Sequence, residues 1–333
     1  MIRSYYIVTA SISALGVASN FLLMYLSIRC SSSKADYKYF VFFSAFQDLI
    51  FAAGFTLISP MASTRNFTFV FANTGPAGVW PYGMIIMVFF CITTITSVLF
   101  VANNFLYRYL SLCKTRLFQM LVSKEFLAVA ILINTVFVAN WMCMIYFSLW
   151  PYDGFIKISQ ELWSKNEVDI ENRTYIAISN RDGTDPLKMG ILIESLALLM
   201  FIAQISPACA MQIHRTLKQN SFSETTKKLH RQTLVLLSIQ TVCPTVFMHL
   251  PLTLMYILLF TGANSPVVMS YIIGTLMASN PLFAPIITIA YPSHIEYGET
   301  DDSILRKRRG SAVPQSDDNT EDIYVPSFIN SRK

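Results

Sequence analysis

The stretch YGMIIMVFFCITTITSVLFVANNFL, residues Tyr82–Leu106, contains no charged side chain and decides the fold class. An α-helix of about 20 apolar residues crosses roughly 30 Å of hydrocarbon, and this stretch exceeds that length. In lipid, every backbone N–H and C=O group must be hydrogen-bonded within the protein. The stretch is therefore predicted to be a membrane-spanning helix.

Six further apolar stretches of similar length give the chain seven predicted spans. The others are Ile7–Ile28, Phe40–Ala62, Phe126–Trp150, Met189–Ile213, Thr233–Phe260 and Val268–Tyr291. The composition agrees, because only 14% of the residues are charged, against about a quarter in soluble domains. We therefore predict an all-α membrane protein, with a seven-transmembrane helix bundle over residues 1–291 and a disordered tail over residues 292–333.

Lysine and arginine gather in the first, third and fifth connections between the spans. These residues are Arg29, Lys34, Lys38, Arg108, Lys114, Arg116, Lys124, Arg215, Lys218, Lys227, Lys228 and Arg231. Short basic connections mark the cytoplasmic side, which predicts an N-terminus outside and a cytoplasmic C-terminal tail. Anchoring of these residues to anionic lipid gives the same orientation.

Modification motifs fit this orientation. N-glycosylation sequons begin at Asn66 and Asn172, both in connections that are predicted to lie outside. The long fourth connection, Pro151–Lys188, is open to two interpretations, a lid over an outward opening or a mobile glycosylated loop. In the tail, Ser311 follows a basic run and is a candidate phosphorylation site. The basic run could equally rest on anionic lipid.

Polar side chains inside spans cost free energy and are therefore candidates for function. Counting about 1.5 Å per residue from the span ends places Asn20, Asp48 and Asn280 in one layer above the cytoplasmic boundary. They are predicted to form an intramembrane network that is hydrogen-bonded or holds a cation. The alternative is an independent set of polar residues that pack helices together. Helix kinks are predicted at three prolines, which are Pro244, Pro251 and Pro281.

Arg108 lies where the third span meets the cytoplasm, between Tyr107 and Tyr109. It could engage a partner at the inner face, or it could be a boundary arginine whose head reaches the interface.

A second set of residues lies toward the opposite ends of the spans and could line an outward pocket. It consists of Glu194, His249, Met84, Met87 and Tyr271. Hydrogen bonding to a neighbouring helix, or packing toward lipid, explains the same residues. No His, Cys, Asp and Glu set has metal-ligand or nucleophile–base spacing. We therefore expect no enzyme, no metal and no cofactor, and no nucleic-acid partner.

Several motifs carry a resemblance to a known family. The stretch QTVCPTVFM, Gln240–Met248, followed by Pro251, resembles the sixth span of nematode seven-transmembrane chemoreceptors of the serpentine Str type (Str/Srd/Srj-like). Asp36–Phe40, Tyr107–Tyr109 and Tyr146–Pro151 resemble that family's second, third and fourth spans. The family's members are G-protein-coupled receptors.

The resemblance implies a multi-pass plasma-membrane receptor in sensory neuron cilia. Such a receptor binds a small organic, often volatile, ligand and activates a heterotrimeric G protein, with Arg108 facing the G protein. Two departures stand out: Asn280 replaces the family's Asp before Pro281, and acidic residues follow the seventh span. They make an eighth, membrane-lying helix doubtful.

Two other classes share a seven-span bundle. A small-solute transporter or channel is the alternative, although the chain lacks the internal repeat typical of many transporters. A retinal-binding light sensor is excluded, because it needs a Schiff-base lysine and Val268–Tyr291 contains none.

Overall fold

The computed structural model describes residues 2–29, 35–114, 117–118, 124–151, 173–180, 185–219, 231, 234–235, 237–239 and 241–310. Within them, seven helices are long and apolar enough to cross a membrane, which confirms the predicted spans. Asn172 and Ser311 lie outside the described residues, as does most of the fourth connection.

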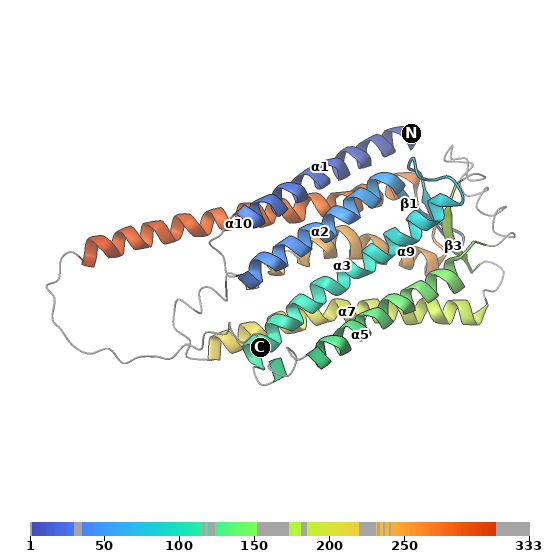
Figure 1. Ribbon diagram of the computed structural model, residues 1–333. Coiled ribbons are helices and arrows are strands. Elements are labelled where there is room, and N and C mark those ends of the chain that lie inside the picture. Colours follow the sequence, from blue (N-terminus) through green and yellow to red (C-terminus); the bar gives the residue numbers. More distant parts are fainter. Residues whose placement is uncertain are drawn as a thin grey trace, which may run out of the picture. The chain divides into compact units, whose positions relative to one another are not determined.

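The helices form an antiparallel bundle (Figure 1). Their bounds are α1 Ile2–Arg29, α2 Ala35–Ile58, α3 Tyr82–Cys113, α5 Lys124–Met144, α7 Pro186–Gln219, α9 Leu250–Thr261 and α10 Val267–Gly310. Helix α9 is the last part of the sixth candidate span, Leu237–Thr261. Two π-helical turns, η1 Ile145–Leu149 and η2 Thr245–His249, continue α5 and lead into α9. Helix α3 contacts α2, α5 and α7, so it lies at the centre of the bundle.

The chain divides into two units, Met1–Ala290 and Tyr291–Lys333. Helix α10 continues past the predicted boundary at Pro292 to Gly310. The disorder predicted for the tail stays a prediction for residues 311–333, which the structure does not describe.

The sequence interpretation did not anticipate a three-stranded antiparallel sheet. Its strands are β1 Pro60–Arg65, β2 Thr68–Asn73 and β3 Tyr175–Ser179, in the order β1-β2-β3. The predicted end of the second span at Ala62 is therefore wrong, because α2 ends at Ile58. Pro60 disfavours helical backbone at Ser59, which adopts φ 39°, and the chain leaves the helix there.

Both faces of the sheet are buried. Phe69, Phe71, Ile176 and Ile178 face the bundle core, where they pack in one cluster with side chains of α2, α3 and α9. The alternate residues Val70, Ala72, Tyr175 and Ala177 pack against Tyr5 of α1 and Tyr271 of α10. The sheet thus covers the end of the bundle at which the chain begins, which we call the sheet end (Figure 1).

The edge of β1 is bonded to the loop between α9 and α10. The backbone N–H of Ser265 donates to Thr64 O (2.8 Å), and Ser265 Oγ accepts from the Thr64 N–H (2.9 Å). The N–H of Asn66 donates to Asn264 Oδ1 (3.1 Å). Pairing of this edge removes the unpaired backbone groups that an edge strand otherwise presents.

The segment after β2 fastens the sheet to α2. The Gly75 N–H donates to Ile58 O (2.8 Å), one of the carbonyls left without a partner at a helix C-terminus. A side chain at Gly75 would collide with the backbone oxygen of Leu57, so this approach requires glycine. Arg173 Nη1 donates to Gly75 O (3.2 Å), which ties the segment before β3 to the same turn.

Candidate functional site

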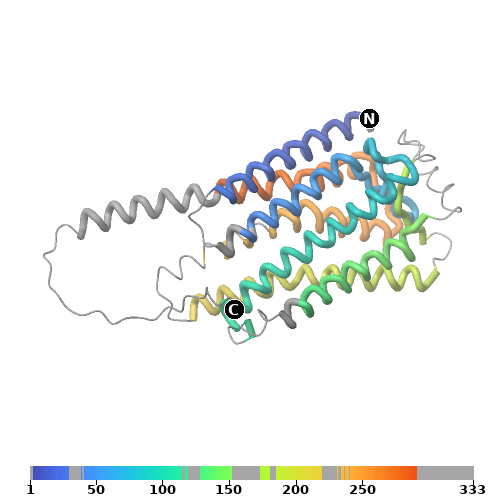
Figure 2. The backbone as a smooth tube through the Cα atoms, in the orientation of Figure 1, coloured from blue at the N-terminus to red at the C-terminus, as the bar shows by residue number. Residues whose placement is uncertain are grey.

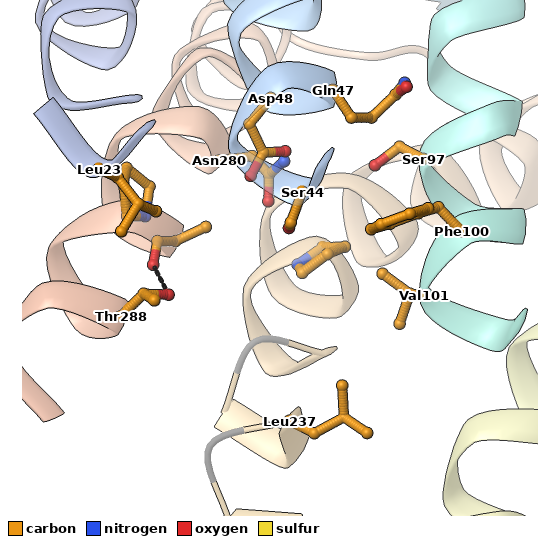
Figure 3. Close-up of a pocket in the computed structure, with 13 residues that line it drawn as sticks. Leu23, Ser44, Gln47, Asp48, Ser97, Phe100, Val101, Leu237, Asn280 and Thr288 are labelled. Atoms are coloured by element: carbon orange, nitrogen blue, oxygen red, sulfur yellow. Dashed lines mark hydrogen bonds between the residues drawn. The ribbon is translucent and has the colours of Figure 1, made fainter. Parts of the chain in front are cut away.

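A small cavity lined by both polar and apolar side chains lies within the bundle (Figure 3), and we call it the polar cavity after Asp48 and Asn280. It has a volume of about 30 Å³, enough for about two water molecules. Its lining residues are Leu23, Ser44, Gln47, Asp48, Ser97, Phe100, Val101, Leu237, Pro244, Asn280, Ala284, Pro285 and Thr288. Figure 3 shows the side chains of Asp48 and Asn280 pointing toward one another from α2 and α10.

Asn20 joins α1 to α10 beside this cavity. Its Nδ2 group donates to Gly16 O (2.8 Å) in its own helix and to Pro281 O (2.7 Å) in α10. The carbonyl of Pro281 would normally accept from the residue four positions later, but that residue is Pro285, which has no N–H. Asn20 therefore supplies the missing donor. Figure 2 shows α1 and the first part of α10 running side by side.

The structure thus brings Asn20, Asp48 and Asn280 to the same region of the bundle. The Oδ1 atoms of Asn20 and Asn280 are buried and have no hydrogen-bond partner among the described residues. Buried polar atoms of this kind ordinarily bind water or an ion. A carboxylate with amide and hydroxyl oxygens nearby has the ligand chemistry of a hard cation or of ordered water. In the described part of the chain, no three His, Cys, Asp or Glu side chains are grouped to hold a metal ion.

Gln47 connects α2 with α3 at the same cavity. Its Nε2 group donates to Thr93 O (2.9 Å) and to Thr96 Oγ1 (3.0 Å). Polar contacts near the cavity therefore join four helices, because Gln47 links α2 with α3 and Asn20 links α1 with α10.

Tyr107, Arg108 and Tyr109 lie near the end of α3 opposite the sheet and point to different surroundings. Tyr109 packs against a cluster formed with α7. Tyr107 is half-exposed, and its ring meets Phe118 edge-on at 5.2 Å. Arg108 is partly buried, and its backbone oxygen accepts from Ser111 Oγ (3.0 Å).

The five predicted pocket residues do not gather in one place. Met84 and Met87 are buried in the core beneath the sheet. Tyr271 lies against the other face of the sheet, stacked on Tyr5 with ring centroids 5.2 Å apart. His249 belongs to η2, and its Nε2 atom is buried without a hydrogen-bond partner among the described residues. Glu194 is exposed, and Asn140 of α5 donates to it.

Methionine is the most frequent buried residue in the core beneath the sheet, and the sequence analysis named only Met84 and Met87. Six methionines of this cluster are buried: Met84, Met87, Met144, Met248, Met255 and Met277. Their side chains come from five helical elements, so helical periodicity within single spans could not reveal the cluster. Phe69 stacks on Tyr256 of α9 above it, at 6.1 Å between centroids.

The predicted kink prolines lie at distinct features. Pro244 immediately precedes η2, and Pro251 immediately follows its junction with α9. A π-helical turn between two prolines follows physically, because each proline withholds a backbone donor from the α-helical pattern. Pro281 lies within α10, where its carbonyl oxygen accepts the hydrogen bond from Asn20 of α1.

Several classes of membrane protein have seven spans, and comparison with known proteins specifies the class of this one. A family model described as "Serpentine type 7TM GPCR chemoreceptor Str" matches residues 5–291. The chain is therefore a seven-span G-protein-coupled chemoreceptor, a multi-pass membrane protein and not an enzyme. It belongs to the Str family, as the motifs of the sequence predicted.

A curated relative agrees with this family. The chain is similar to the Caenorhabditis elegans protein "G-protein coupled receptor str-33", with 23% identity over 247 residues. The match covers 70% of this chain and 72% of the relative.

Proposed function

We propose that this protein is a plasma-membrane receptor of sensory neuron cilia that binds a small organic or volatile ligand and activates a heterotrimeric G protein. The sheet end and the N-terminus face outside in this proposal, and the end of α3 that bears Arg108 faces the cytoplasm. Asn66 is exposed at the turn between β1 and β2, where a glycan can project from the outer surface.

The core beneath the sheet carries the proposal for the ligand. Six buried methionines belong to one cluster with Phe51, Phe55 and Phe90. The centroids of these three rings lie about 6 Å or less from one another. Methionine has three rotatable bonds and a polarisable sulfur, so a methionine-rich core can repack around apolar molecules of different shapes. These residues support a small, apolar, uncharged ligand that displaces methionine side chains.

Signal transfer then follows from differential affinity. A ligand that binds better to one arrangement of the core shifts an existing equilibrium toward that arrangement. The core contains Met248 of η2 and Met277 of α10, so repacking acts directly on two helical segments whose backbones contain or adjoin proline. The polar cavity at Asp48 and Asn280 lies between this core and the Arg108 end, where a shift of α10 changes its packing.

The inner face carries positive charge that suits an acidic partner surface. Lys114, Arg215, Lys218 and Arg231 are all exposed at the described ends of their helices. A basic surface raises the association rate with a complementary acidic one. We assign contact with the G protein to this surface and the switching role to Arg108, with Tyr107 and Tyr109 beside it.

The test is a reporter cell that expresses the full chain with a panel of odorants. We expect a G-protein-dependent calcium or cAMP response that Arg108→Ala abolishes at unchanged surface level. Arg29→Ala is the matched control, because Arg29 lies at the same predicted level but contacts Tyr25 within α1. A ligand response that survives Arg108→Ala would refute the proposed coupling site.

A further inference from the structure

The exposed face between α5 and α7 contains a polar pair where an apolar surface is expected. Asn140 Nδ2 of α5 lies 3.3 and 3.4 Å from the two carboxylate oxygens of Glu194 in α7. Glu194 is exposed and stands eight residues after Pro186, or about 12 Å along the helix. Ionisable side chains within spans are expensive and mark pathways or sites. The pair joins α5 to α7, but Glu194 is exposed, so one side of its carboxylate stays open to the surroundings.

Gly190 leaves open space beside the pair. It precedes Glu194 by one helical turn, and a Cβ atom built there meets no heavy atom within 4 Å. The neighbouring exposed side chains are large and apolar, such as Ile193 and Phe147. A small residue and a polar pair thus interrupt a surface that otherwise suits lipid.

Ser195 faces the opposite way, into the bundle. It is only 1% exposed, and its Oγ atom is buried without a hydrogen-bond partner among the described residues. Its helical neighbour Leu192 is fully buried in the methionine-rich core. One short segment of α7 therefore presents the exposed carboxylate of Glu194 on the outside and the unsatisfied hydroxyl of Ser195 toward the core.

The sheet closes the other direct approach to this core. Every residue of β2 is buried, and the backbone of β1 is paired with β2 on one side and bonded to Ser265 at Thr64 on the other. An approach from water through this sheet would break backbone pairing and expose both of its apolar faces. An approach between α5 and α7 needs only side chains to move.

We propose that ligands reach the methionine-rich core sideways, from the bilayer leaflet on the sheet side, between α5 and α7 at Gly190, Asn140 and Glu194. This inference rests on the proposed ligand site and adds its route and chemical class. The long hydrogen bonds from Asn140 leave the carboxylate able to accept others. The route therefore admits a neutral lipophilic molecule with one hydrogen-bond donor. Such a molecule partitions into the bilayer and donates a hydrogen bond to the Glu194 carboxylate on its way inward.

The experiment uses the full chain in lipid nanodiscs with two photoreactive probes. One is a diazirine-bearing alkyl alcohol that dissolves in the bilayer, and the other is its quaternary ammonium analogue that stays in water. Mass spectrometry locates the labels on inward residues such as Ser195 and Leu192 and on the outward residue Ile193. We expect the alcohol to label the inward residues and the ammonium probe to leave them unlabelled.

Gly190→Trp fills the open space and should strongly reduce inward labelling, while Ile193 remains labelled. Because Gly190 has no neighbour within 4 Å, this variant should fold normally. Cys143→Trp narrows the same face from α5, where Cys143 is exposed. Phe201→Trp is the control, since Phe201 is exposed on α7 almost two turns beyond Ser195.

Three results would overturn the route: inward labelling unchanged in both tryptophan variants, inward labelling by the ammonium probe, or no inward labelling by either probe. The labelling needs no G protein, so it is separable from the proposed function. Labelling that depends on Gly190 in a chain that gives no G-protein signal would uphold the route and refute the signalling role.

Discussion

The sheet end and the polar cavity differ in how completely their backbone and polar groups are paired. At the sheet end, strands are buried on both faces, their edge is bonded to the α9–α10 loop, and Gly75 caps α2. At the cavity, amide oxygens of Asn20 and Asn280 lack partners among the described residues, and prolines interrupt the helix beside it. Backbone pairing restricts the sheet to one arrangement, even though the buried Thr64 Oγ1 of β1 has no hydrogen-bond partner among the described residues. Unsatisfied polar atoms beside proline-interrupted helices permit several arrangements. The sheet end therefore acts as a fixed cover, and the cavity marks the level at which the bundle can rearrange.

The largest expected loss of stability tests the packing of the sheet against the core. Phe71→Ala removes a buried ring between the sheet and the core and should destabilise the protein by about 3–5 kcal/mol. Thermal unfolding in detergent measures it, with Val79→Ala as the control because Val79 is exposed beside the sheet. A small, equal effect of both substitutions would mean that the sheet does not pack as described.

The next effect tests the junction of α1 and α10. Asn20→Ala leaves the buried carbonyl of Pro281 without its donor and should cost about 1–3 kcal/mol. Pro285→Ala restores a backbone N–H four residues after Pro281, so the double variant should recover part of the loss. Additive destabilisation in this double-mutant cycle would contradict the role given to Asn20.

A smaller effect tests the edge of the sheet. Ser265→Ala removes the hydroxyl that bonds Thr64 and Ser63 but keeps the backbone bond to Thr64 O. We expect a loss of about 1 kcal/mol in unfolding free energy. Ser279→Ala is the matched control, because its hydroxyl bonds only within α10. Equal losses of unfolding free energy from the two variants would show that the α9–α10 loop does not stabilise the edge of β1.

The smallest effect is expected at the cavity. Gln47→Leu breaks the side-chain link from α2 to α3, and interhelical hydrogen bonds in membranes are worth about 0.6 kcal/mol on average. Stability should hardly change, whereas ligand-independent signalling in the reporter cell should rise as α2 and α3 separate more easily. A large loss of stability without altered signalling would contradict this prediction, because it would show that the cavity belongs to the rigid part of the molecule.

The sequence allowed the spans to be predicted, because length and hydrophobicity alone determine which segments enter lipid. The depth of Asn20, Asp48 and Asn280 was also predictable, since helical rise converts sequence position into height. The sheet was not predicted, because its strands are short and β3 joins β2 from a distant connection. The residues TFVFAN, Thr68–Asn73, after a turn at Asn66, were the available signal.

The residues predicted for an outward pocket lie in different surroundings, for a different reason. Position along a span gives height but not direction, and Glu194 and Met87 differ in direction. Glu194 is exposed whereas Met87 is fully buried. Tyr271 was assigned to the pocket wall, but an unpredicted sheet separates it from the core.

The order of strands also constrains how the chain is assembled during synthesis. Strands β1 and β2 form a hairpin as soon as the segment between α2 and α3 has emerged, but Phe71 pairs with Ile176. The third strand therefore arrives only after α5 has entered the bilayer and returned the chain to the same side. Until then, the hydrogen-bonding edge of β2 and both apolar faces of the hairpin stay open to chaperones. Completion of the sheet thus requires that the first four spans have been inserted in the right direction.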